Sequence, residues 1–210
     1  MAANGRIPAA FSAAFEGRSR HARAAGDCIA FAVRLDFAGR KLSRAQVTPE
    51  EPFSIRPFDG QLDEVRALFR EYEAFLGIDL CFQNFEAELA ELPGRYAPPD
   101  GALFLAWVGD RIEGCVALRD LGDGVCEMKR LYVRPACRGL GLGRQLAERL
   151  VEEASAIGYT KMKLDTFEFL DGAVQIYQEM GFRRTGSYYE NPHQRVQYWE
   201  LALSRPAGSE

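Results

Sequence analysis

The stretch "RPACRGLGLGRQLAERL", residues 134–150, constrains the fold more than any other part of the chain. Gly139, Gly141 and Gly143 alternate within five residues, and an amphipathic run follows them directly. Glycines this close together let the backbone turn sharply and approach another group, because they carry no Cβ atom. The run that follows predicts a helix reaching residue 157, with an apolar residue at every fourth position: Leu142, Leu146, Leu150 and Ala154.

The chain from residue 51 onward predicts one α/β domain. Apolar residues alternate or recur at helical spacing, with Gly, Pro and Asp between the segments. Asp59 is expected to cap the first helix. The predicted order is strand 53–58, helices 61–76 and 81–92, strands 102–108, 111–121 and 125–133, the helix after the glycines, strand 161–167, helix 170–180, and strands 182–189 and 196–203. We therefore expect a domain at 51–204 and a short tail at 205–210.

Residues 1–50 read differently from the rest of the chain. They hold eight basic and four acidic residues and are rich in Ala, Arg, Gly and Ser, with weak periodicity. Three interpretations stay open: a disordered extension, an organelle transit peptide, or a gene start placed upstream of a true start near Val47. This N-terminal extension is excluded from the predicted fold.

Composition limits the classes of partner. The net charge of −4 gives no general attraction to nucleic acid or to an anionic membrane. No apolar run approaches the ~20 residues of a membrane span. The five cysteines form no Cys-x-x-Cys pair and are odd in number, which favours a reducing cytoplasm. The two histidines lie far apart, so no zinc or other metal site is expected.

Three kinds of phosphate-binding loop could use glycines in this pattern. A P-loop needs Lys and then Ser or Thr after its last glycine, whereas Gly143 precedes Arg144 and Gln145. A dinucleotide-binding loop needs Gly-x-Gly-x-x-Gly directly after a strand, whereas four residues separate these glycines from the preceding strand. The third is a loop at a helix start, where free backbone N–H groups and the helix dipole bind a diphosphate.

This third pattern resembles the coenzyme A pyrophosphate signature of the GCN5-related N-acetyltransferases (GNAT), Arg/Gln-x-x-Gly-x-Gly/Ala, at residues 138–143. Two other stretches are similar to that family: "EMKRLYVRP" at 127–135 and "AVQIYQEMGF" at 173–182. The resemblance covers about residues 53–203. It implies an α/β fold with a mixed central sheet of about six to seven strands and about four flanking helices. The family often has Asn where this chain has Leu170.

The resemblance implies an acetyl-CoA-dependent N-acetyltransferase without a metal. Glu127 is the candidate general base, and the alternative is an exposed strand residue paired with Lys129 or Arg119. Tyr177 is the candidate acid for the departing thiolate, and the alternative is a core aromatic. The implied cofactor-binding residues are Leu131, Tyr132, Val133, Arg138, Gly139, Leu140, Gly141, Leu142, Gly143 and Arg144.

The acceptor is expected to be a primary amine of a small molecule. Residues 59–91 contain nine acidic residues and only two basic ones, which would attract a cationic acceptor unless they are solvated outer faces. Neither nucleic acid nor a membrane is an expected partner, and a homodimer is left open. The alternative function is a non-catalytic coenzyme A-binding or sensory module. Two roles stay open for four aromatic residues, either lining the opposite wall of the acceptor site or simply packing in the fold: Tyr188, Tyr189, His193 and Trp199.

Overall fold

The computed structural model describes residues 53–204, apart from the side chain of Phe82. The expected N-terminal extension and tail lie outside the described residues. The elements are β1 (Ser54–Pro57), α1 (Leu62–Leu76), η2 (Cys81–Gln83), α2 (Phe85–Glu91), η3 (Gly94–Tyr96), β2 (Ala102–Val108), β3 (Arg111–Gly122), β4 (Val125–Val133), η4 (Pro135–Cys137), α3 (Leu142–Ile157), β5 (Lys161–Phe167), α4 (Asp171–Glu179), β6 (Arg183–Thr185) and β7 (Val196–Ala202). No helix among residues 53–204 is both long and apolar enough to cross a membrane.

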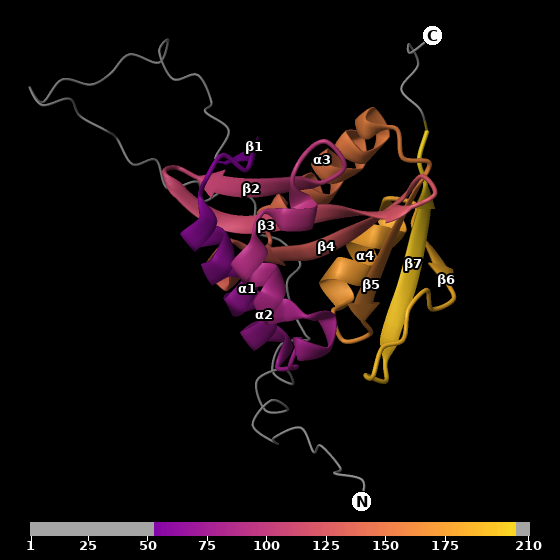
Figure 1. Cartoon of the computed structure of the whole chain (residues 1–210). Coiled ribbons are helices and arrows are strands. Elements are labelled where there is room, and N and C mark those ends of the chain that lie inside the picture. The colour runs from indigo at the N-terminus through magenta and orange to yellow at the C-terminus, as the bar shows by residue number, and fades with distance from the viewer. Residues whose placement is uncertain (1–52, 205–210) are drawn as a thin grey trace, which may run out of the picture. The chain divides into compact units, whose positions relative to one another are not determined.

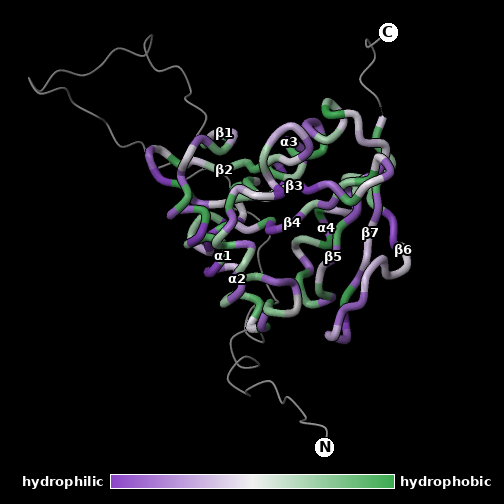
Figure 2. The backbone as a smooth tube through the Cα atoms, viewed as in Figure 1, coloured by the Kyte–Doolittle hydropathy of each residue, from purple (hydrophilic) through white to green (hydrophobic). Residues whose placement is uncertain are grey.

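The strands form one seven-stranded mixed sheet in the order β1-β2-β3-β4-β5-β7-β6 (Figure 1). Every neighbouring pair is antiparallel except β4 and β5, which run parallel with α3 as their crossover. The α/β fold and the element order therefore confirm the sequence prediction. Figure 2 shows hydrophobic and hydrophilic residues alternating along α1, as expected for a helix with one face against the sheet.

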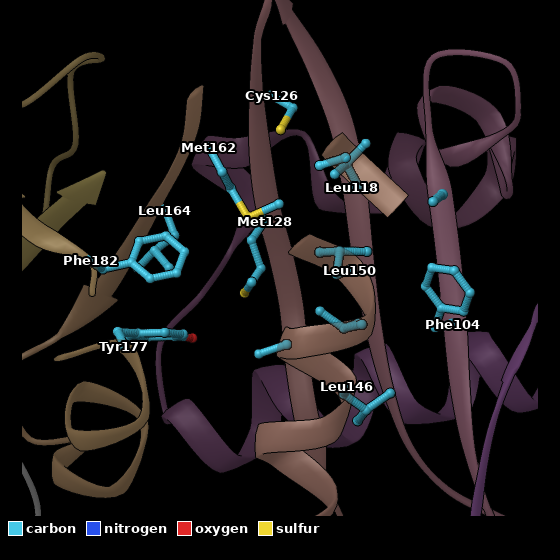
Figure 3. Packing of buried hydrophobic residues seen from close by; sticks show 14 of the residues in the cluster. Phe104, Leu118, Cys126, Met128, Leu146, Leu150, Met162, Leu164, Tyr177 and Phe182 are labelled. Atoms are coloured by element: carbon cyan, nitrogen blue, oxygen red, sulfur yellow. The ribbon is translucent and has the colours of Figure 1, made fainter. Parts of the chain in front are cut away.

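Each face of the sheet carries its own apolar cluster. The α1/α2 face buries Val65, Leu68 and Phe69 of α1 against strand residues such as Leu105. The α3/α4 face buries the predicted stripe of α3 against Met128 of β4 and its neighbours (Figure 3). Side chains that alternate along β4 therefore point to different clusters on the two faces of the sheet.

Three local predictions were wrong. Asp59 does not cap α1, because the helix begins at Leu62 and Gln61 occupies the N-cap position, with no side-chain capping bond. The side chain of Gln61 instead accepts the N–H of Asp59. The single helix expected at 81–92 is broken at Asn84, whose backbone is left-handed (φ 61°), into η2 and α2. The strand expected at 182–189 is only three residues long, because the segment after Thr185 leaves the sheet and folds over its α1/α2 side.

Strand β4 separates from β5 partway along its length. The parallel pairing joins Val125–Glu127 to Lys161–Lys163 and stops there, although β5 continues to Phe167. On the other side, the register between β3 and β4 shifts between Cys115 and Ala117, where β4 carries an extra residue. The second half of β4 therefore has main-chain groups that no strand pairs on the β5 side.

Candidate active site

The glycine loop ends in the first turn of α3. Gly139 and Gly141 have φ values of 83° and 85°, a backbone conformation that side chains with a Cβ atom rarely adopt. A Cβ atom built at either position would meet no other atom within 4 Å. The two glycines are thus required by the backbone turn, and the space in front of them is open to a ligand.

This loop presents a run of free donors. Within residues 53–204, no acceptor binds the main-chain N–H groups from Gly139 to Arg144, and the first helical bond runs from the Gln145 N–H to the Gly141 carbonyl. No acidic side chain lies in the first helical turn, so the positive end of the helix dipole is not neutralised there. Such a cradle fits the two phosphates of a diphosphate.

The two arginines beside the loop already have partners. Arg138 donates from Nε to the Val133 carbonyl at 3.0 Å, and its guanidinium lies over the Phe75 ring at 4.1 Å. Arg144 is ion-paired with both Glu148 and Glu179. Carboxylates therefore offset the charge of Arg144, whereas Arg138 keeps its charge and is held by a carbonyl and a ring. The backbone N–H groups are the main feature of the site.

Leu131, Tyr132 and Val133 occupy the part of β4 that β5 does not pair. Tyr132 is buried against Tyr72 and Phe75 of α1, whereas Leu131 and Val133 pack toward the α3/α4 cluster. A Cβ atom at Gly114, on β3, would lie only 2.7 Å from the Tyr132 carbonyl oxygen. Gly114 therefore allows β3 and β4 to approach closely next to the bulge.

Glu127 is fully buried, with 0% of its side chain exposed. Arg119 donates from Nε to Oε2 at 2.6 Å, and the Tyr188 hydroxyl donates to Oε1 at 2.7 Å. The pairing with Arg119 matches the alternative interpretation, but the exposure expected there is wrong. Both carboxylate oxygens are engaged, so a proton can reach Glu127 through Tyr188 without any rearrangement of the carboxylate.

Lys129 extends this polar network across the α1/α2 face. Its side chain is 5% exposed, and its Nζ donates to Gln83 Oε1 at 3.1 Å and to Asp165 Oδ1 at 3.3 Å and lies 3.9 Å from Glu127 Oε1. Gln83 also contacts the Tyr189 hydroxyl at 3.5 Å. The network therefore joins β4 and β5 to η2 and to the loop after β6.

Tyr177 projects from α4 into the α3/α4 cluster. It is 5% exposed and packs against Phe182, with ring centroids 5.6 Å apart. Figure 3 shows its hydroxyl directed toward the side of β4. Burial raises the pKa of Tyr177 well above its usual range, so the hydroxyl keeps its proton at physiological pH. Both the core-aromatic role and the proton-donor role fit this position.

Three tyrosine rings lie beside the Glu127 network. Tyr188, Tyr189 and Tyr198 contact one another edge to face, with centroids 5.3 to 5.7 Å apart. A surface pocket next to them is lined by Ser187, Tyr189, Glu190, Asn191, Pro192 and Tyr198. Trp199, expected on the same wall, is buried in the α3/α4 cluster, because neighbouring strand residues face opposite sides of the sheet.

Arginines offset part of the negative charge of the acidic early helices. Ion pairs join Asp63 to Arg66, Glu73 and Glu86 to Arg70, Glu88 to Arg130, and Glu64 and Glu71 to Arg134. Four arginines pair with six of the nine acids, so the negative charge available to attract a cation is smaller than the sequence suggests, and an acidic excess remains. Leu170, where the resemblance implies Asn, packs against the α1/α2 cluster. Within residues 53–204, no three His, Cys, Asp or Glu side chains are grouped as they would be at a metal site.

The sequence indicated Arg119 or Lys129 as partners of Glu127, but it indicated neither Gln83 nor the Tyr188 hydrogen bond. Glu127, Tyr177 and the glycine loop are marked by local patterns, and the structure puts each of them on the element expected. The contacts of Gln83 and Tyr188 join segments 46 and 61 residues away along the chain. No periodicity or motif signals those pairings.

Residues 62–182 match the model of the acetyltransferase (GNAT) family. An uncharacterised N-acetyltransferase of Schizosaccharomyces pombe is 43% identical over 150 residues, which cover 69% of this chain and 90% of that protein. An IAA acetyltransferase of Azospirillum brasilense is 33% identical over 129 residues, or 60% of this chain and 81% of the relative. A crystal structure of a GNAT acetyltransferase from Elizabethkingia anophelis with acetyl-CoA bound superposes with a TM-score of 0.54 at 21% identity, over 73% of this chain and all of that one. The chain is a member of the GNAT family of N-acetyltransferases, with the GNAT fold.

Proposed function

We propose that this protein transfers the acetyl group of acetyl-CoA directly to a primary amine of a small molecule, in the cytoplasm. The observation that carries the proposal is the run of free main-chain N–H groups from Gly139 to Arg144, next to the unpaired half of β4. The pyrophosphate of coenzyme A fits the first feature, and its pantetheine arm fits the second, because that arm carries amide groups that can pair with a strand edge. When bound, acetyl-CoA supplies an acetyl thioester.

The main-chain N–H groups of Leu131 and Val133 polarise the thioester carbonyl in this proposal. Both residues follow Glu127, in the part of β4 that β5 does not pair. A main-chain donor aimed at a developing oxyanion contributes about 2.7–4 kcal/mol to catalysis. This contribution needs donors that are already fixed in place before the reaction, and the bulge provides a fixed backbone.

Glu127 and Tyr188 remove the proton of the acceptor. An alkylamine with a pKa near ~10.4 is neutral in only about one molecule in ~10³ at pH 7.4, and selecting that fraction costs about 4 kcal/mol. Tyr188 Oη accepts the proton from the amine while its own proton passes to Glu127 Oε1 along the 2.7 Å hydrogen bond. The Arg119 guanidinium stabilises the carboxylate before the transfer.

Tyr177 gives a proton to the departing thiolate. Its raised pKa keeps it protonated, but it also makes the transfer uphill toward a thiolate, whose conjugate acid has a pKa of ~8.5. We therefore assign Tyr177 a helping role. The acceptor itself enters beside the tyrosine rings, where the pocket lined by Tyr189 and Tyr198 opens to the surface.

A release assay for coenzyme A thiol, with acetyl-CoA and a panel of polyamines, amino acids, aminoglycosides and peptide N-termini, tests the function. We expect at least one small primary amine to stimulate thiol release, with the acetylated amine identified by mass spectrometry. Tight binding of acetyl-CoA with no acetyl transfer to any amine would instead favour the non-catalytic module. Acetylation restricted to peptide N-termini would contradict the small-molecule assignment.

A further inference from the structure

Arg130 stands at the bulge of β4 in a conformation that needs support. Its φ of 57° is left-handed, which is unfavourable for a residue with a long side chain, and it is only 4% exposed. It falls between Lys129 and Tyr132, where the register with β3 shifts. The interactions of its side chain must therefore hold this backbone in place.

Those interactions come from α2 and η3 on the α1/α2 face. Arg130 donates from Nε and Nη2 to the two oxygens of Glu88, at 2.9 and 2.5 Å. Glu88 Oε1 also accepts the Tyr96 hydroxyl at 2.7 Å. Although burial opposes ionisation, the hydrogen bonds and charge of Arg130 hold the pKa of Glu88 below its ordinary value. The pair is thus ionised, bidentate and enclosed.

Aromatic rings complete the enclosure. The guanidinium carbon of Arg130 lies 5.0 Å from the Phe85 ring centroid, 5.9 Å from that of Phe69 and 6.0 Å from that of Tyr72. A guanidinium held by two hydrogen bonds and packed against rings has little freedom to move. Its backbone is thereby fixed at the point where β4 changes register.

We propose that the Arg130–Glu88 pair is a positioning pair that sets the bulge of β4 and aims the main-chain N–H groups of Leu131 and Val133. The pair also links β4 to α2. Gln83 of η2, which precedes α2, accepts a hydrogen bond from Lys129 of the Glu127 network. The inference rests on the proposed function for its catalytic consequence, but the geometry of the bulge can be measured without any activity.

The test replaces both members at once, as Arg130→Met with Glu88→Leu. Removing one member alone leaves a buried charge without its partner and can prevent folding, whereas exchanging a buried pair for apolar residues is often neutral or stabilising. Arg134→Met is the matched control. Arg134 follows β4, is also bidentate to a helix carboxylate (Glu71), and lies outside the bulge.

Two readouts separate positioning from stability. Cross-strand contacts between β3 and β4, measured by NMR, should lose the register shift at Ala117 and Cys115 in the double variant and keep it in the control. Affinity for acetyl-CoA should fall by about tenfold or more, the effect of a lost hydrogen bond of ordinary strength, while affinity for 3′-phosphoadenosine 5′-diphosphate, which lacks the pantetheine arm, should stay unchanged.

An unchanged register in a folded double variant would overturn the proposal, and so would unchanged acetyl-CoA affinity. If the double variant does not fold, Arg130→Lys decides, because lysine keeps the charge but not the two-pronged bond. It should shift the resonances of Leu131 and Val133, and unaltered resonances would refute the role. Failure of the wild-type protein to bind acetyl-CoA would contradict the proposed function, while the register measurement would still judge the pair.

Discussion

The Tyr188 hydroxyl donates a 2.7 Å hydrogen bond to Oε1 of Glu127, from a residue 61 positions further along the chain. The bond holds the loop after β6 over the first part of β4 and covers one oxygen of a fully buried carboxylate. Arg119 covers the other oxygen. In the proposed mechanism, an acceptor amine reaches the charge of Glu127 through the Tyr188 hydroxyl, and the first two predictions test this path.

Tyr188→Phe should lower kcat/KM by about 10²-fold, toward the low end of the ~10²–10⁴ range for general acid–base catalysis, because the relay loses its hydroxyl but keeps its ring. Tyr189→Phe is the matched control, since Tyr189 contacts Gln83 and Asn191 and has no bond to Glu127. Steady-state kinetics of both variants with the best acceptor measure the difference. Equal losses in the two variants would remove Tyr188 from the proton path.

Glu127→Gln should lower kcat/KM by ~10²–10⁴, and the loss should shrink as the pH rises. More acceptor is then already neutral, so less is gained from a base. A pH–rate profile of the variant against wild type gives this dependence. Arg119→Met is the comparison for a purely structural role, because it breaks the same ion pair and keeps the carboxylate. If Glu127 only anchors Arg119, both variants should show the same pH-independent loss.

Local sequence patterns predicted the elements that lie on either side of this site. The four-residue spacing of Leu142, Leu146, Leu150 and Ala154 marks a helix face, and all four are buried in α3. The glycines at 139 and 141 mark a turn that only a residue without Cβ adopts easily, and both have positive φ. These features depend on neighbours in sequence, so the sequence alone is enough to find them.

The polar network depends on residues distant in sequence, and its geometry could not be predicted. Lys129 meets Gln83 from a segment 46 residues earlier, and that meeting requires the break at Asn84 to separate η2 from α2. The helical spacing of apolar residues, about 3.6 residues per turn, does not indicate such a break, because that spacing continues through it. The pairing of acids on the early helices is likewise in part a tertiary result, since Glu88 of α2 pairs with Arg130 of β4 and Glu71 of α1 pairs with Arg134, which follows β4.

Acetyl-CoA at ~100 times its Kd should stabilise the fold by about 2.7 kcal/mol, and Gly141→Val should abolish that stabilisation. Valine forces a Cβ atom into the open space before the loop and disfavours its φ of 85°. Gly60→Val controls for backbone strain, because Gly60 has a φ of 92°, an equally open surrounding and no place in the loop. Without ligand, the free energy of unfolding of both variants should fall by about 1–2 kcal/mol. In differential scanning fluorimetry, only Gly60→Val should keep the rise in melting temperature that acetyl-CoA causes. A normal shift in Gly141→Val would reject the pyrophosphate assignment.

Deleting residues 1–50 should leave the melting temperature and the acetyl-CoA affinity unchanged. Residues 53–204 already contain the seven-stranded sheet, both apolar clusters and every candidate site residue. Calorimetric unfolding and titration of the shortened chain against the full chain measure both quantities. A large loss of stability would show that the domain begins before residue 51.

Tyr177→Phe should lower turnover by less than ~10²-fold, below the usual general-acid range, and leave acetyl-CoA affinity nearly intact. Phenylalanine keeps the ring contact with Phe182, so the α3/α4 cluster is preserved. Because burial raises the pKa of Tyr177 far above that of free tyrosine, its hydroxyl stays protonated across the accessible pH range. The wild-type rate should therefore show no decline near pH ~10 from this residue, although an exposed tyrosine acid would titrate there. A pH–rate profile to the alkaline limit of stability checks this. A basic limb near ~10 that disappears in Tyr177→Phe would mean that the hydroxyl is solvated during turnover, and wild-type turnover in the variant would leave Tyr177 with a packing role alone.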